Sequence, residues 1–415
     1  MRKEQLDFDS VLMAYGDDAR GEMENDSLYQ KAASAAGISD EELDRHVPMG
    51  KDGRTYSKTK HQIRWIQQSL KRAGLLERTD IRGKWRLTHE GRKKVELRKA
   101  VNGFSMLAFS NKLGIAIWGD ARHVFSQIDE PITLTVTSPP YPIKYGRAYG
   151  SWRENEIIDL IAGVLEPIVN NLVDGGSVML NLGNDVFEDG LPSRSIYFEK
   201  LVVRLYETLG LRKMDTLVWH NPSKAPGPVQ WANIERVQLS TGYEPVLWMC
   251  NNPAKAKTDN RRVLEPVSER YQRLIDQGGE KRTAVNGDGT HTVKEGSFSR
   301  QVDGKIPSNV IRIGHSSAST NRYRRLCDEY GLPIHGAMYP YGLAEFLVRF
   351  GSEEGDLVAD PFGGALTTAL AANNNNRRFI TADIMHEYLK GGSLRFDDAE
   401  MHPQFEKIYN GYAAA

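Results

Sequence analysis

A strand-like run that stops at two consecutive prolines is the feature that most constrains how this chain folds. Residues 132–141 read ITLTVTSPPY, and the β-branched run before Ser138 is typical of a buried parallel strand. Open α/β sheets bind ligands at the ends of such strands. Because Pro139 and Pro140 lack backbone N–H groups, the carbonyls of this stiff loop are free to accept hydrogen bonds from a ligand. Rigid acceptors beside the ring of Tyr141 suit a flipped nucleobase with an amino group; a stiff exit from the strand is the alternative.

A second constraint lies more than 200 residues further along the chain. Residues 356–384 (DLVADPFGGALTTALAANNNNRRFITADI) predict a short strand, a glycine turn after Asp360, a helix and a second strand that ends in Asp383. The 23-residue separation of the two acids matches a mononucleotide-binding βαβ unit, in which the second acid is positioned for ribose hydroxyls. The G-x-G-x-x-G fingerprint is missing, so a purely structural βαβ unit is the alternative.

The first hundred residues predict a small helical domain with a wing. Apolar residues recur every three or four positions over residues 61–76, which predicts an amphipathic helix. Residues 78–87 predict a hairpin that turns at Gly83, and Thr88 is placed to cap another helix. Helix, hairpin and helix, with basic residues beside Trp85, is the arrangement of a winged helix-turn-helix. Such domains bind DNA or dock onto proteins.

Charge is unevenly distributed although its sum is zero, with 54 basic and 54 acidic residues. Residues 51–100 hold 16 basic and 5 acidic side chains, and residues 251–330 hold 15 and 10, while the segments around them are acidic. Two basic regions in an acidic background indicate a polyanionic partner, because attraction to phosphate depends on local potential. Either region alone is also consistent with a solvated face.

Composition argues against several other classes of protein. The only cysteines, Cys250 and Cys327, form no CxxC pair, and no histidines cluster at ligand spacing, so we expect two core thiols and no metal site. No apolar run reaches eighteen residues, and the first thirty residues are crowded with charges. We therefore expect neither a membrane span nor a signal peptide, and a cytoplasmic protein.

The two constraining segments, in this order, resemble the beta class of amino-group DNA methyltransferases, which use S-adenosylmethionine. In that class a catalytic (D/S/N)-PP-(Y/F/W) motif comes first and a cofactor-binding DPFxGSGTT motif lies near the C-terminus. Here SPPY at Ser138–Tyr141 and VADPFGGALTT at Val358–Thr368 match these motifs. The resemblance extends to AIWGDAR (116–122), DGGSVMLNLGN (174–184) and LVWHNPSKAPGP (217–228), and it covers residues 113–395 apart from a recognition insert. Residues 65–95 also resemble the N-terminal domain of Mrr-type restriction proteins.

The resemblance implies an α/β protein with a Rossmann-like methyltransferase fold, built on a mostly parallel doubly wound sheet. We expect a winged-helix domain at 1–100, a catalytic half at 101–228, a target-recognition region at 229–335 and a cofactor-binding half at 336–415. Residues 101–113 are expected to be a packed connector.

The recognition region is expected to hold phosphates or guanine edges through its basic side chains. Its stretch from 277 to 304 is rich in Gly, Asp, Thr and Ser and is expected to form a mobile loop that orders on DNA. The basic candidates are Arg261, Arg262, Lys281, Arg282, Arg322, Arg324 and Arg325.

The resemblance assigns the catalytic site to Ser138, Pro139, Pro140 and Tyr141. Hydrogen bonds from the amine to the Ser138 hydroxyl and the Pro139 carbonyl would turn the nitrogen lone pair toward the sulfonium methyl while Tyr141 stacks on the base. Transfer is then a direct in-line displacement that depends on positioning and needs no metal.

The resemblance places the cofactor beside residues near the ends of three strands. These residues are Asp120, Asp360, Phe362, Gly363, Gly364 and Asp383. Two positions depart from the family pattern. The usual Gly-Ser-Gly is Gly364-Ala365-Leu366, which puts Leu366 close to the methionine end of the cofactor, and His220 stands where Lys is usual.

The leading hypothesis is a site-specific methyltransferase that acts on the exocyclic amine of a flipped base in double-stranded DNA. Ser138 slightly favours cytosine N4, and adenine N6 stays open. The alternatives are an RNA or protein-amide methyltransferase of the same fold and a DNA-binding regulator without activity, which the departure at Leu366 suggests. Enzymes of this class often form dimers, so the resemblance leaves a homodimer open, and it also leaves a companion restriction endonuclease open; the sequence decides neither.

Overall fold

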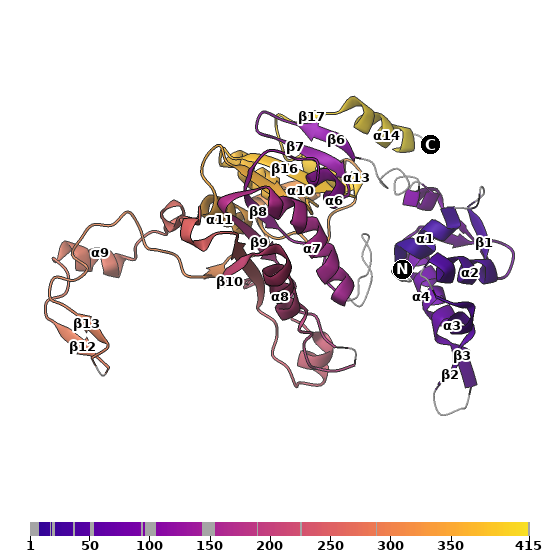
Figure 1. Ribbon diagram of the computed structural model, residues 1–415, viewed down its shortest axis with the longest axis horizontal. Coiled ribbons are helices and arrows are strands. Elements are labelled where there is room, and N and C mark those ends of the chain that lie inside the picture. Colours follow the sequence, from indigo (N-terminus) through magenta and orange to yellow (C-terminus); the bar gives the residue numbers. More distant parts are fainter. Residues whose placement is uncertain are drawn as a thin grey trace.

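The computed structural model describes residues 8–95, 105–142 and 154–413, apart from short gaps at 17, 19–20, 36–37, 50–53, 93, 189, 225 and 288. Figure 1 shows two groups of elements: a small one at the N-terminal end of the chain and a large sheet with helices on both faces.

The N-terminal group is a helical domain with a three-stranded sheet in the order β1-β5-β4. The predicted hairpin is present as β4 and β5, and it turns at Gly83, whose φ of 88° lies in the left-handed region that favours glycine. The third strand, β1, was not predicted. The elements are α1 (Phe8–Gly16), β1 (Glu22–Glu24), α2 (Asn25–Ala35), α3 (Asp40–Asp44), β2 (His46–Met49), β3 (Arg54–Ser57), α4 (Lys58–Arg72), β4 (Leu76–Arg78) and β5 (Lys84–Leu87).

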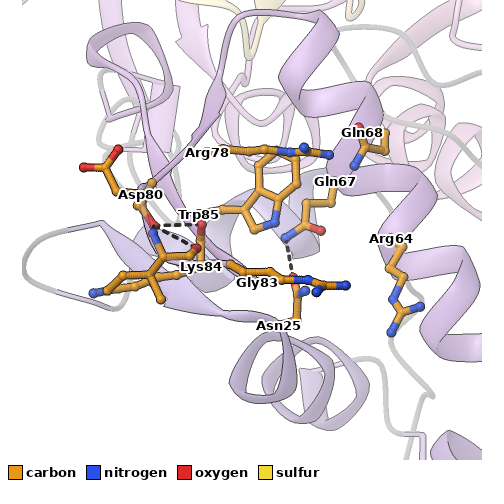
Figure 2. Close-up of a pocket in the computed structure, with 12 residues that line it drawn as sticks. Asn25, Arg64, Gln67, Gln68, Arg78, Asp80, Gly83, Lys84 and Trp85 are labelled. Carbon is orange, nitrogen blue, oxygen red and sulfur yellow. Dashed lines mark hydrogen bonds between the residues drawn. The ribbon is translucent and has the colours of Figure 1, made fainter.

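Helix α4 confirms most of the predicted helix at 61–76. The hydroxyl oxygen of Ser57 caps it by accepting a hydrogen bond from the backbone N–H of Lys60 (3.1 Å). Gln67 donates from its amide to Asn25 on α2 (3.1 Å; Figure 2), which ties the helix to its neighbour. The buried residues on the inner face of α4 are Ile63, Ile66, Gln67 and Leu70.

The predicted cap at Thr88 is present, because the Thr88 hydroxyl oxygen accepts a hydrogen bond from the backbone N–H of Gly91 (3.1 Å).

The main sheet has ten strands in the order β14-β10-β11-β9-β8-β15-β16-β7-β6-β17. The central strands from β9 to β7 all run parallel, whereas β11 and β6 pair antiparallel with their neighbours. The sheet is therefore mixed, with the predicted parallel order restricted to its centre and one outer pair. The strands are β6 (Ser105–Ser110), β7 (Gly114–Gly119), β8 (Ile132–Thr137), β9 (Leu172–Asn181), β10 (Arg212–His220), β11 (Tyr243–Cys250), β14 (Val310–Arg312), β15 (Leu357–Asp360), β16 (Arg378–Asp383) and β17 (Glu400–Met401).

Helices cover both faces of the sheet, so it is doubly wound as predicted. One apolar core contains residues of α6, α7 and α8, and the other contains residues of α11 to α14. Because β8 and β15 contribute to both cores, their side chains are buried on both faces, which explains their continuous apolar runs. The helices are α6 (Ala121–Phe125), α7 (Glu154–Asn170), α8 (Tyr197–Leu209), α10 (Ala318–Glu329), α11 (Tyr341–Gly351), α12 (Thr367–Asn374), α13 (His386–Ser393) and α14 (Pro403–Ala413).

Two segments differ from the sequence-based expectation. The connector expected at 101–113 contains strand β6, which pairs antiparallel with β7; residues 101–104 lie outside the described residues. The region expected at 229–335 contributes two strands to the main sheet, because β11 lies between β10 and β9, and β14 pairs with β10.

Part of the stretch between β11 and β14 projects away from the main sheet (Figure 1). It contains α9 (Glu269–Asp276) and a hairpin of β12 (Ala284–Asn286) and β13 (His291–Val293). The stretch at 277–304 was expected to be a loop, so this hairpin is a correction.

The remaining compositional expectations concern thiols, metals and membranes. Cys250 and Cys327 are both free and buried, as expected. Within the described ranges, no helix is long and apolar enough to cross a membrane. Among the described residues, no group of three or more His, Cys, Asp or Glu side chains could hold a metal ion.

Candidate active site

Five parallel strands bring the predicted site residues to one edge of the sheet. Because β9, β8, β15, β16 and β7 are adjacent and parallel, their carboxyl ends meet at the same edge. Ser138 follows β8 directly, Asp360 ends β15 and Asp383 ends β16. Asp120 follows β7, and Asn181, which the sequence reasoning did not single out, ends β9.

The SPPY loop is held by the strand next to it. Ser138 donates from its hydroxyl to the backbone carbonyl of Asn181 (3.2 Å). Tyr141 packs over Gly183, where an added Cβ would lie 2.8 Å from Cδ2 of the ring. Tyr197 donates to the carbonyl of Gly183 (2.5 Å), which fixes this backbone from the other side. The aromatic ring of the motif therefore lies on a position that only glycine can occupy.

Asp360 connects the two motifs directly. Thr137, the last residue of β8, donates from its hydroxyl to Oδ1 of Asp360 (2.6 Å), and Phe362 donates its backbone N–H to the same oxygen (3.2 Å). Asp360 is 2% exposed, and burial raises its pKa to about 6. Its carboxylate accepts hydrogen bonds from these two donors, so Asp360 connects the SPPY loop to the DPFGG loop within the protein.

The glycine turn after Asp360 closes against β16. Gly363 donates its N–H to the carbonyl of Ala382 (2.9 Å), and Gly364 donates to Oδ2 of Asp383 (2.7 Å). An added Cβ at Gly363 would lie 2.3 Å from Oγ1 of Thr381. At Gly363 the backbone therefore lies too close to Thr381 for a side chain. The carboxylate of Asp383 holds the turn through its hydrogen bond with Gly364.

Leu366 is enclosed by protein on all sides. Its backbone is left-handed (φ 58°), and its side chain is fully buried in the core that contains α11 and α12. An added Cβ at Gly392 on α13 would lie 2.5 Å from Cγ of Leu366. The side chain therefore packs between Gly392 and Gly363, where an added Cβ would lie 3.1 Å from Cδ2 of Leu366. That Leu366 lies close to the methionine end of the cofactor stays a prediction.

Asp120 caps the short helix α6 and is paired internally. Its Oδ1 accepts from the backbone N–H of Arg122 (2.9 Å), and its Oδ2 accepts from the guanidinium of Arg122 (2.5 Å). Although burial opposes the charge, these bonds from Arg122 keep the pKa of Asp120 below its usual value. The group at the end of β7 is therefore an ionised carboxylate.

A polar chain behind the SPPY loop was missed by the sequence reasoning. The amide Nδ2 of Asn181 donates to Glu244 on β11 (3.1 Å), and Lys224 bridges Glu244 (3.1 Å) and Asp185 (3.4 Å). Asn181 is 6% exposed, and its Oδ1 has no hydrogen-bond partner within the described residues. The four residues come from separate strands and loops, so no sequence spacing marks them. Asn181 and Lys224 lie in stretches that the motif comparison singled out, 174–184 and 217–228, whereas Asp185 and Glu244 do not.

Another missed residue is a buried arginine that holds the start of α12. Arg395 is 5% exposed and donates to the carbonyl of Ala365 (2.6 Å) and to the hydroxyl of Thr367 (3.0 Å). Burial lowers its pKa to about 10, so it stays charged at neutral pH. It fixes the backbone on both sides of Leu366.

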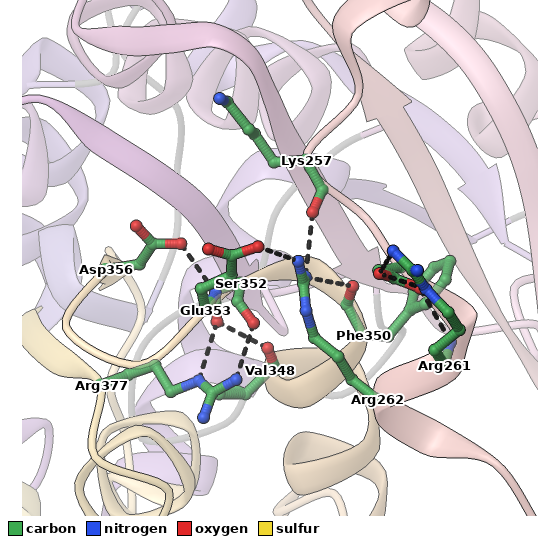
Figure 3. Close-up of polar contacts among 10 residues, drawn as sticks. Lys257, Arg261, Arg262, Val348, Phe350, Ser352, Glu353, Asp356 and Arg377 are labelled. Carbon is green, nitrogen blue, oxygen red and sulfur yellow. Dashed lines mark hydrogen bonds and ion pairs between the residues drawn. The ribbon is translucent and has the colours of Figure 1, made fainter. Parts of the chain in front are cut away.

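Several basic residues expected to contact DNA are bound within the protein. Arg262 donates to the carbonyl of Lys257 (3.0 Å) and pairs with Glu353 (2.5 Å), and Figure 3 shows its guanidinium between these groups. Arg261 pairs with Asp259 (2.6 Å) but keeps 83% of its side chain exposed. These contacts give Arg262 a structural role, and contact of either arginine with DNA stays a prediction.

A parallel sheet centre with helices on both faces, and with SPPY and DPFGG loops meeting at one edge, defines a Rossmann-like methyltransferase. The family model described as DNA methylase matches residues 132–393, and the model described as Mrr N-terminal domain matches residues 8–96. The chain belongs to the DNA methylase family and carries an Mrr-like N-terminal domain. Enzymes of this family use S-adenosylmethionine as the methyl donor, and S-adenosylmethionine is therefore the cofactor of this chain.

Individual relatives agree with this assignment. Type II methyltransferase M.PvuII of Proteus hauseri is 30% identical over 310 residues, which cover 73% of this chain and 91% of that protein. DNA adenine methyltransferase YhdJ of Escherichia coli (strain K12) is 26% identical over 298 residues, which cover 70% and 85%. The solved structure of PvuII DNA methyltransferase (cytosine-N4-specific) superposes with a TM-score of 0.56 at 26% identity and covers 74% of this chain and 94% of that one.

Proposed function

We propose that the chain transfers a methyl group from S-adenosylmethionine to the exocyclic amine of a base flipped out of double-stranded DNA, with cytosine N4 as the preferred target. The hydrogen bond between Thr137 and Asp360 is the observation that carries the proposal. It fastens the loop that would hold the base to the loop that would hold the cofactor. Two loops braced in this way bring a nucleophile and a methyl donor into a fixed geometry, which is the main source of rate in a direct displacement.

Ser138 supports the proposal through the direction of its hydrogen bond. Its hydroxyl proton is donated to the carbonyl of Asn181, so the lone pairs of its oxygen are left for an N–H of the base amine. The carbonyl of Pro139 supplies the second acceptor. Two acceptors draw the amine toward tetrahedral geometry and leave its lone pair directed at the methyl carbon.

Tyr141 would hold the plane of the base. Its ring lies against Gly183, so one face is fixed before a base arrives, and the base would stack on the other face. Fixing the ring lowers the conformational entropy lost on binding.

The residues at the edge of the sheet fit S-adenosylmethionine. When bound, it supplies an electrophilic methyl group on a cationic sulfur. The close approach of Gly363 to Thr381 and of Gly364 to Asp383 keeps side chains out of this turn. The ionised Asp120 offers an acceptor to an amino group, and Asp383 offers its remaining lone pairs to hydroxyls.

Cytosine N4 is preferred because Ser stands first in the catalytic motif and because the PvuII enzyme, described as cytosine-N4-specific, is 30% identical. Adenine N6 is the second candidate, since a serine oxygen and a proline carbonyl serve either amine and one relative is an adenine methyltransferase.

The test is transfer of label from tritiated S-adenosylmethionine to duplex DNA, tRNA and bulk protein by the full chain, followed by nucleoside mass spectrometry. We expect label on duplex DNA, recovered as N4-methylcytosine, and none with Ser138→Ala. Label recovered as N6-methyladenine would correct the base. Label on tRNA or protein alone, or on nothing, would refute the proposal.

A further inference from the structure

A pocket of about 440 Å³ lies in the Mrr-like domain between α4 and the β4–β5 hairpin. Figure 2 shows Arg64, Gln67 and Gln68 on the α4 side and Arg78 with Trp85 on the hairpin side. A volume of this size falls within the range of roughly 300–1,000 Å³ found for small-molecule sites. No part of the methyltransferase fold contributes to it.

The charged residues that line this pocket are three arginines, Lys84 and one acid, Asp80. The acidic N-terminal segment folds onto the basic one, so that Lys84 pairs with Glu22 (2.6 Å). Within the described part of the chain, Arg64, Arg78 and Arg82 have no carboxylate within 4 Å. All three arginines line this cavity, which favours an anionic ligand, and Arg64 also donates from Nε to the hydroxyl of Tyr29 (2.5 Å).

Arg78 adds a flat surface to the pocket. Its guanidinium lies 5.2 Å from the centre of the Trp85 ring, and the ring itself is 4% exposed. Arg78 is exposed, so its planar cation is held on one face by the indole and is open on the other. A planar base stacks on such a guanidinium, and a phosphate pairs with its edge.

Gln67 provides a buried acceptor in the same wall. It is 2% exposed, and it uses its amide N–H groups on the hydroxyl of Tyr15 (2.7 Å) and on Asn25 (3.1 Å). Its amide oxygen accepts no hydrogen bond within the described residues. An N–H donor on a ligand would satisfy it, and every base except thymine or uracil carries an exocyclic amine.

We propose that this pocket binds one nucleotide, with its phosphate on Arg78 and Arg82, its base stacked on the guanidinium of Arg78 and an N–H of the base donated to Gln67. A nucleotide of a DNA strand and a free nucleoside phosphate share this chemistry. The inference deepens the DNA-binding role expected of the domain, and it does not depend on methyl transfer.

The test is photocrosslinking of the full chain to a single-stranded DNA oligonucleotide that carries one 5-iodocytosine, which keeps the exocyclic amine, with the adducts mapped by mass spectrometry. We expect adducts on peptides from residues 64–86, and at least a tenfold lower yield in Arg78→Gln and in Arg82→Gln. Arg72→Gln removes an equal charge from the exposed end of α4, outside the pocket, and is expected to keep the yield. Because Arg82 is exposed at the tip of the hairpin, its variant keeps the test valid if Arg78→Gln unfolds the domain.

Competition then identifies the source of the nucleotide. Protection by millimolar deoxynucleoside monophosphates assigns the pocket to a free nucleotide, and protection by unlabelled oligonucleotide alone assigns it to DNA; both support the pocket. Equal loss in Arg72→Gln, equal yield in all variants, or adducts confined to residues 105–413 would overturn it. Ser138→Ala is expected to leave the yield unchanged, so a failure of the pocket is distinguishable from a failure of methyl transfer.

Discussion

Thr137 and Asp360 are 223 positions apart in the chain, and they are joined by a hydrogen bond of 2.6 Å at the ends of two adjacent parallel strands. Because one strand leads into SPPY and the other into DPFGG, this bond sets the distance between the two loops. Thr137→Val, which keeps the shape and removes the donor, is expected to lower kcat about tenfold or more. Thr137→Ser keeps the donor and is the matched control. Equal losses in both variants would show that the hydroxyl has no part in positioning.

Asp360 makes stability depend on pH. Burial raises its pKa to about 6 from an ordinary value near 3.8, so the folded state binds more protons between these values. The free energy of unfolding therefore falls as pH rises from about 4 to 6, by about 3 kcal/mol, and is flat above. Asp360→Asn is expected to gain stability relative to the parent across this window in urea titrations. A parallel pH profile for parent and variant, with exposed Asp129→Asn as control, would contradict this.

Ser138→Ala and Tyr141→Ala are expected to reduce methyl transfer at least a hundredfold while S-adenosylmethionine binds as in the parent. The reason is that both side chains face the base, and the cofactor loop is held by other residues, Asp360 and Asp383. Rapid-quench transfer and calorimetric cofactor titration separate the two effects. Loss of cofactor binding in both variants would mean that the roles are misassigned.

Glu244 is expected to act through Asn181. Glu244→Ala frees the Asn181 amide behind the SPPY loop and leaves Lys224 with Asp185 as its remaining ion-pair partner. We expect kcat to fall about tenfold to a hundredfold with little change in the KM for DNA. Glu244→Gln retains an acceptor for Asn181 and should recover most of kcat. A rise in KM alone would instead indicate direct contact with DNA.

Leu366 and Gly392 are expected to be energetically coupled. Leu366→Ala should destabilise the fold by about 2–5 kcal/mol, and Gly392→Ala by about 1–3 kcal/mol. Because the added Cβ meets Leu366 itself, Gly392→Ala should cost at least about 1 kcal/mol less when residue 366 is already Ala. Urea unfolding of the two single variants and the double variant gives this cycle. Strict additivity would show that the two side chains do not share the space.

Removal of residues 1–100 is expected to weaken DNA binding and to flatten its dependence on salt. The basic side chains of the Mrr-like domain would release counterions from DNA, and each phosphate contact adds about 0.9 to the slope of log K against log salt. Anisotropy titrations at several salt concentrations measure this slope, with S-adenosylmethionine binding as the folding control. An unchanged slope would make the domain a protein-docking module.

Some strands were predictable because the residues of the strand match the burial that the strand has in the fold. Strands β8, β15 and β16 were expected from their β-branched and apolar residues, which suit strands whose faces are both buried. Strand β6 was not, because its register shifts between Leu107 and Phe109, which breaks the alternation that marks a strand. Strand β11 was assigned to an insert, because nothing in its own residues says that it lies between β9 and β10.

The sequence by itself determined the order of the motifs, the residue types at the strand ends and the presence of a separate basic domain. The tertiary structure decided which of these residues touch. It paired Thr137 with Asp360, enclosed Leu366 in the core, placed Glu244 behind Asn181 and gathered three unneutralised arginines around one pocket. The physical reason is that strand pairing and ion pairing depend on distances between segments that are remote in the chain, whereas periodicity and motif spacing are local.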